Sequence, residues 1–155
     1  MTKPTAVPAL ALRVSRTVAA GRERVFRAWT EPAQLKRWFG ADEGFIIPIA
    51  EVDLRVGGRY RLGMQPPGSA QVLIVGGVYR EVQAPAKLVF TWRWEAAGAA
   101  EPDTVVTIEF HERANATEVI LTHEQFVDAV QRDSHALGWE GCFERLSRLL
   151  AAQPE

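Results

Sequence analysis

Three residues, His123, His135 and Cys142, are the first candidates for acid–base or nucleophilic chemistry in this sequence. His123 continues an alternating run with Val119 and Leu121, so it is expected on the inward face of a strand. If both imidazole rings reach one cavity, they could bind a polar group of a hydrophobic ligand or act as acid and base. The alternative is a pair of structural histidines, because buried polar groups usually have hydrogen-bond partners.

Metal and thiol chemistry is not expected. His135 and Cys142 are two helical turns apart, about 10 Å along a helix, which is too far to share a metal ion. A nucleophilic cysteine needs a base and a lowered pKa, so we interpret Cys142 as an inert buried thiol. The sequence contains no G-x-S-x-G, H-E-x-x-H, C-x-x-C or G-x-x-x-x-G-K-[ST] motif. No catalytic residue, metal or cofactor is therefore expected.

The helix that would position His135 spans about residues 129–150 and contains two glycines, each of which costs about 1 kcal/mol relative to alanine. Small residues at Gly138 and Cys142, beside bulky Trp139 and Phe143, predict a gap between this helix and the sheet. The alternative is that Gly138 only permits close packing. Gly141 falls on the polar side and has no evident role. The apolar stripe contains His135, Trp139, Cys142, Phe143, Leu146, Leu149 and Leu150.

The elements before this helix follow from the spacing of apolar residues. Residues 9–18 alternate as a strand, and residues 21–39 form two short helices because Pro32 suits a helix start. Gly57 and Gly58 predict a tight hairpin with positive φ at both positions. An antiparallel meander of about six strands is expected, with strands at residues 52–56, 60–64, 71–82, 87–94, 104–112 and 117–126.

Five segments carry a resemblance to a known family: LRVSRTVAAGRERVFRAWTEPAQLKRWFG, DLRVGGRYRL, LVFTWRWE, TEVILTHEQF and GWEGCFERL. In this order they resemble the activator of heat-shock protein 90 ATPase homologue family, of the START-like (SRPBCC) helix-grip superfamily. The resemblance covers nearly the whole chain. It implies an α+β helix-grip fold, in which a curved antiparallel sheet of about six to seven strands wraps around a long C-terminal helix, with two short helices after the first strand. A single domain over residues 1–155 is expected, with loose termini at residues 1–8 and 152–155.

The resemblance also implies an internal cavity for a hydrophobic small molecule. Alternate residues of a strand face the same side of a sheet, which predicts the inward residues of most strands. The inward face of residues 71–82 is not assigned, because both parities are apolar. Trp38 and Phe39 resemble the residues that close the cavity mouth in this superfamily. The expected cavity-lining residues are Trp38, Phe39, Leu88, Phe90, Trp92, Trp94, Ile108, Phe110, Leu121, His123, His135, Gly138, Trp139, Cys142 and Phe143.

Charge and composition exclude several classes of partner. The net charge is −1, and we therefore expect neither nucleic-acid nor anionic-membrane binding. A single cysteine, with no signal peptide or membrane span in the pattern, predicts a cytoplasmic protein. The alternating charges at Glu51, Asp53, Arg55, Arg59 and Arg61 predict a solvated face or a protein-docking surface.

Together these observations predict a protein that binds a hydrophobic, aromatic small molecule in an internal cavity, without established catalysis. The superfamily includes enzymes, carriers and chaperone activators, so the fold does not identify a reaction. One alternative is a polyketide cyclase or aromatase-like enzyme that uses His123 or His135. Another is a chaperone-interacting module that uses its outer surface. A contact between two copies of the chain, as a homodimer, is a further expectation for this surface.

Overall fold

In the described residues, 10–40, 43–100 and 102–152 of the computed structural model, seven strands form one antiparallel sheet. Neighbouring strands follow the order β1-β7-β6-β5-β4-β3-β2, so the first strand pairs with the last. The strands are β1 (Leu12–Val18), β2 (Ile46–Val52), β3 (Arg59–Gln65), β4 (Leu73–Gln83), β5 (Lys87–Trp94), β6 (Thr104–Arg113) and β7 (Ala116–Glu124).

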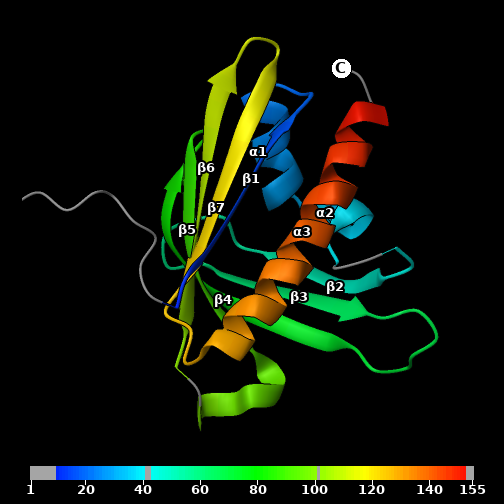
Figure 1. Ribbon diagram of the computed structural model, residues 1–155, viewed down its shortest axis with the longest axis vertical. Helices are drawn as coiled ribbons and strands as arrows, with labels where there is room; N and C mark the ends of the chain where they lie inside the picture. Colours follow the sequence, from blue (N-terminus) through cyan, green and yellow to red (C-terminus); the bar gives the residue numbers. More distant parts are fainter. Residues whose placement is uncertain (1–9, 41–42, 101, 153–155) are drawn as a thin grey trace, which may run out of the picture.

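The long C-terminal helix lies on the inner side of this curled sheet. Figure 1 shows α3 crossing the sheet, with β2 and β3 running almost perpendicular to β6 and β7. Phe143 and Leu146 of α3 are 1% and 0% exposed, because their side of the helix packs into the core. The described helices are α1 (Arg22–Thr30), α2 (Pro32–Trp38), α3 (Ala129–Ala152) and the short 3₁₀ helix η1 (Glu95–Ala100). The expected α+β helix-grip class is confirmed.

Two short helices follow the first strand, as expected. Glu31 between them has extended backbone, with φ −97° and ψ 125°, and Pro32 occupies the first turn of α2. The indole Nε1 of Trp38 donates a hydrogen bond to the Ala28 carbonyl oxygen at 2.9 Å, and both residues are buried. This bond joins α2 to α1.

The hairpin between β2 and β3 differs from the expected tight turn. Strand β2 ends at Val52, and residues 53–58 form the connection. Leu54 and Val56 are 39% and 64% exposed, although they continue the alternating pattern. Gly57 has a φ of 85°, whereas a Cβ on Gly58 would lie 2.0 Å from the Asp53 carbonyl oxygen. The prediction of positive φ at both glycines was wrong, because Gly58 is needed for a close backbone approach instead.

The inward face of β4, which the sequence left unassigned, contains Val75 and Tyr79, at 0% and 4% exposed. The register with β5 shifts between Tyr79 and Glu81, so the alternation does not continue unchanged along the strand. The expected loose termini at residues 1–8 and 153–155 lie outside the described residues, and Ala152 is the last residue of α3. Within the described part of the chain, no helix has the length and apolar character needed to cross a membrane.

Candidate ligand-binding cavity

A cavity of about 300 Å³ lies between α3 and the inner side of β3, β4 and β5. Ser134 lines it and is exposed, so the cavity reaches the surface beside the first turns of α3. Pockets for small molecules typically begin at about this volume. The lining residues are Phe39, Phe45, Met64, Leu73, Trp92, Trp94, Ser134, His135, Gly138, Trp139 and Cys142.

Seven of the residues expected from the sequence lie in this wall: Phe39, Trp92, Trp94, His135, Gly138, Trp139 and Cys142. The other eight are buried in the core but are not among the lining residues: Trp38, Leu88, Phe90, Ile108, Phe110, Leu121, His123 and Phe143. Their space is filled by other elements. Phe26 of α1, for example, packs edge-to-face on Phe110 at a centroid distance of 5.5 Å.

Four lining residues were not expected from the sequence: Phe45, Met64, Leu73 and Ser134. Met64 continues the inward alternation of Tyr60 and Leu62, so its position in the wall could have been predicted from the strand pattern. Ser134 precedes Gly138 by one helical turn, so it could have been predicted from the helical spacing. Leu73 lies in the strand whose parity was ambiguous. Phe45 lies before β2, where no periodicity applies.

Gly138 borders the cavity without making a close contact. A Cβ built at this position meets nothing within 4 Å. Close helix-to-sheet packing therefore does not require glycine here, and the missing side chain enlarges the space beside α3.

Aromatic rings form much of the wall. Trp92, Trp139 and Phe39 contact one another, with centroid distances of 5.0 Å from Trp92 to Trp139, 6.4 Å from Trp92 to Phe39 and 6.1 Å from Phe39 to Trp139. Trp94 packs edge-to-face on Trp92 at 5.6 Å, with an interplanar angle of 90°. Offset and edge-to-face contacts of this kind favour the binding of a further ring.

His135 lies in the wall and both ring nitrogens have partners. Its Nε2 accepts a hydrogen bond from the Trp94 indole at 3.0 Å, so the proton is on Nδ1, which donates to the Gln131 carbonyl oxygen at 2.7 Å. Burial lowers the pKa of His135, which keeps the ring neutral.

His123 lies behind the wall and is 0% exposed. Its Nδ1 accepts from the Trp139 indole at 3.0 Å, and its Nε2 donates to the Thr104 hydroxyl at 2.7 Å. Burial lowers the pKa of His123 to about 2, and the nearby His135 adds to this effect. The two imidazole centroids are 5.2 Å apart. Because indole N–H groups occupy both acceptor nitrogens, neither histidine can take up a proton without losing a hydrogen bond.

Cys142 is buried, and its thiol donates to the Gly40 carbonyl oxygen at 3.3 Å. Burial raises the pKa of the thiol to about 12, which disfavours the thiolate that nucleophilic or metal chemistry needs. Among the residues described, no group of three histidine, cysteine or acidic side chains could hold a metal ion.

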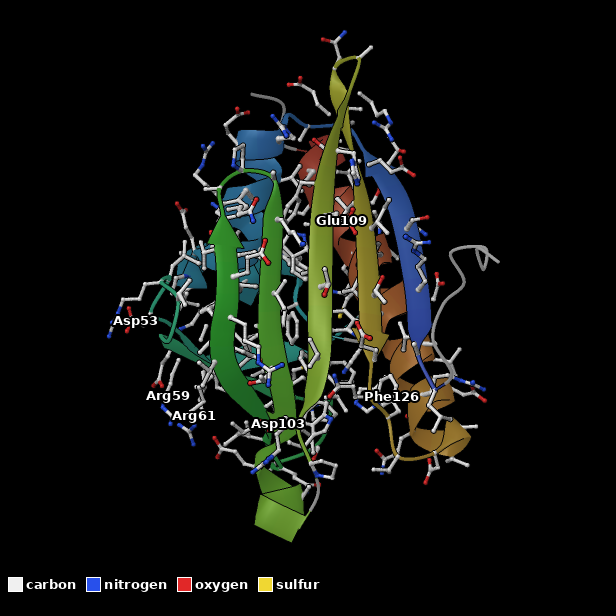
Figure 2. All side chains as sticks on the ribbon, turned by 90° about the vertical axis from the view of Figure 1, so that its left-hand side faces the viewer. Asp53, Arg59, Arg61, Asp103, Glu109 and Phe126 are labelled. Atoms are coloured by element: carbon white, nitrogen blue, oxygen red, sulfur yellow. The ribbon has the colours of Figure 1, made fainter. Side chains whose placement is uncertain are left out.

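Charged side chains of β3 and of the connection between β2 and β3 lie on the outer side of the sheet, where Figure 2 labels Asp53, Arg59 and Arg61. Arg61 pairs with Glu95 at 2.6 Å and Arg55 pairs with Asp53 at 3.0 Å. These pairs are largely exposed, and pairs of this kind contribute at most about 1 kcal/mol each.

Comparison with solved structures supports the fold. A protein from Chromobacterium violaceum is 28% identical, with a TM-score of 0.80 over 94% of this chain and 99% of that chain. The AHSA1 protein from Silicibacter pomeroyi is 27% identical, with a TM-score of 0.80 over 92% and 98% of the two chains. The protein CalU16 from Micromonospora echinospora is 21% identical and shares the fold, with a TM-score of 0.68 over 90% of this chain and 75% of that chain.

Comparison with curated protein sequences gives no match. The model of the family described as activator of Hsp90 ATPase homolog 1-like protein (AHSA1) matches residues 19–151. Since this match covers α1, α2, six of the seven strands and nearly all of α3, the chain belongs to the AHSA1 family.

Proposed function

We propose that this protein binds a hydrophobic small molecule with an aromatic ring in the cavity between the sheet and α3. The observation that carries the proposal is a cavity of about 300 Å³ whose wall is mostly aromatic and aliphatic, with open space beside Gly138. Binding there removes apolar surface of the ligand and of the cavity wall from water, and each Å² removed contributes about 25 cal/mol of favourable free energy.

The hydrogen bonds of the two histidines favour binding over catalysis. A general base needs a free lone pair within reach of the substrate. The acceptor nitrogens of His123 and His135 are both occupied by indole donors. A cyclase-like reaction would have to break one of these bonds first.

The test is Gly138→Leu, assayed with N-phenyl-1-naphthylamine, an uncharged probe whose fluorescence rises in apolar surroundings. A leucine side chain would project into the cavity, so we expect probe affinity to fall at least about tenfold, while the helix gains about 1 kcal/mol from losing a glycine. Glu140→Leu, at an exposed position of the same helix, is the control and should bind as the wild type does. Unchanged affinity in a folded Gly138→Leu variant contradicts the proposal.

The family adds a second candidate, contact with a chaperone of the Hsp90 type. Two apolar side chains on one side of α3, Val130 and Leu137, are 79% and 76% exposed, and such residues often belong to interaction surfaces. If this candidate holds, the protein should stimulate the chaperone's ATPase, and Leu137→Asp should reduce the stimulation. Absence of stimulation by the wild type contradicts it.

A further inference from the structure

The polar groups of the cavity wall fall into two sets, those with a hydrogen-bond partner and those without. The indole N–H groups of Trp94 and Trp139 donate to histidines, and the Cys142 thiol donates to a carbonyl oxygen. The Nε1–H of Trp92 is buried and has no partner among the described residues. The hydroxyl of Ser134 likewise has none in the described part of the chain.

The two unpaired groups lie on opposite sides of the cavity. Trp92 is on β5 and is 5% exposed, at the sheet side of the space. Ser134 is on α3 and exposed, at the side open to solvent. Both groups can donate a hydrogen bond, and the Trp92 Nε1–H is buried, so bulk solvent does not reach it.

The same wall offers no charge and no free nitrogen acceptor. None of the lining residues that the structure describes is acidic, lysine or arginine. The one imidazole in the wall, His135, is kept neutral by burial, and its acceptor nitrogen is held by Trp94. A carboxylate or an ammonium group would therefore be buried without a counterion, which is costly.

We propose that the cavity selects a neutral aromatic molecule that carries a hydrogen-bond acceptor, such as a ketone oxygen, and that the Trp92 N–H is the donor that recognises it. This inference rests on the proposed function, because it assumes that the same cavity holds the ligand. The N–H lies within the wall, so the indole has to turn, or a neighbouring ring has to move, before the oxygen reaches it. The acceptor would then satisfy a group that the unliganded protein leaves unpaired.

Matched probes separate the contributions of charge and acceptor. 8-Anilinonaphthalene-1-sulfonate differs from N-phenyl-1-naphthylamine by one sulfonate, and we expect it to bind at least about tenfold more weakly. 6-Propionyl-2-(dimethylamino)naphthalene and its propyl analogue differ by one carbonyl oxygen. The propionyl compound should displace N-phenyl-1-naphthylamine at a concentration about tenfold lower than the propyl compound.

Trp92→Phe removes the donor and keeps an aromatic ring. In this variant the tenfold preference for the propionyl compound should disappear, so that the two compounds bind with equal affinity; the readout is the ratio of the two affinities, because Trp92 also lines the cavity. The matched control is Trp29→Phe, because Trp29 is also 5% exposed and has an Nε1 without a partner in the described residues, but it does not line the cavity. Trp29→Phe should keep the preference.

A direct readout remains if Trp92→Phe does not fold. In the ¹H–¹⁵N spectrum of the wild type, the indole proton of Trp92 should move downfield with the propionyl compound and not with the propyl compound. Equal affinity for the two compounds, a preference that survives in folded Trp92→Phe, or a preference lost in Ser134→Ala instead, overturns the inference. Failure of every neutral probe to bind contradicts the proposed function itself.

Discussion

The indole Nε1 of Trp139 lies 3.0 Å from the Nδ1 of His123, and this hydrogen bond fixes the tautomer of a fully buried imidazole. Because Nδ1 accepts, the proton is on Nε2, which donates to Thr104, whose hydroxyl donates in turn to the Trp92 carbonyl oxygen at 3.0 Å. The chain of bonds joins α3, β7, β6 and β5 behind the cavity. A second proton on His123 would place two donors against each other and break it.

This arrangement predicts that the protein loses stability in acid. Histidine has an ordinary pKa of 6.5, and burial lowers the pKa of His123 to about 2. As the pH falls below 6.5, the unfolded chain takes up a proton that the folded chain refuses until pH about 2, so stability is full above this window and falls within it. From pH 7.5 to 5.0, His123 should remove about 2 kcal/mol from the free energy of unfolding, measured with urea.

The variant that checks this origin is His123→Gln. A glutamine can accept from Trp139 and donate to Thr104 without titrating, so the loss between pH 7.5 and 5.0 should shrink. His111→Gln is the control, since His111 lies on β6 with its ring beside Glu109 at 2.9 Å, away from the buried chain. If His123→Gln lost as much stability between pH 7.5 and 5.0 as the wild type, the loss would have to come from other titrating groups.

The sequence predicted sheet faces better than it predicted the cavity. Leu88, Phe90 and Trp92 are 1%, 7% and 5% exposed, because a period of two decides the inward side of a strand without reference to its neighbours. Whether an inward residue borders empty space depends on what lies opposite. Phe110 faces inward too, but Phe26 of α1 fills the space beside it, and no periodicity encodes that contact.

The hydrogen-bond partners of the two histidines could not be predicted from the spacing of residues in the sequence either. Alternation placed His123 on the inward face, but its partner Trp139 comes from α3 and depends on how that helix is rotated. The prediction of the β2–β3 turn was wrong because the sequence pattern continues beyond the end of the strand. Leu54 and Val56 continue the alternation in sequence while the backbone turns, so a strand pattern extended into a connection.

The two glycines Gly77 and Gly138 should respond in opposite ways to alanine. A Cβ on Gly77 would lie 2.0 Å from the Thr91 carbonyl oxygen, which belongs to the paired backbone of β5, whereas a Cβ on Gly138 meets nothing within 4 Å. We expect Gly77→Ala to lower the free energy of unfolding by more than about 2 kcal/mol and Gly138→Ala to raise it by about 1 kcal/mol. Urea unfolding at pH 7.5 measures both.

The opposite ranking of these two variants would contradict the local geometry on which the cavity depends. If Gly138→Ala destabilised the protein, the open space beside α3 would not exist in solution, and the cavity proposal would lose its main support. A Cβ built on Gly77 lies only 2.0 Å from the Thr91 carbonyl oxygen. If Gly77→Ala did not change the stability, the backbones of β4 and β5 would have to be further apart at this point than the structure shows.

One face of α3 packs on the sheet and the other faces solvent, so the same substitution should have different effects at two leucines of the helix. Leu146 is 0% exposed and Leu137 is 76% exposed. Leu146→Asp buries an unpaired carboxylate in the core and should lower the free energy of unfolding by more than about 4 kcal/mol, a large fraction of the roughly 5–15 kcal/mol that stabilises an ordinary domain. Leu137→Asp places the same group in water and should shift the thermal midpoint by only a few degrees. Circular dichroism melts measure the thermal midpoints of both variants. A well-folded Leu146→Asp variant would mean that α3 does not pack on the sheet through the face that contains Leu146.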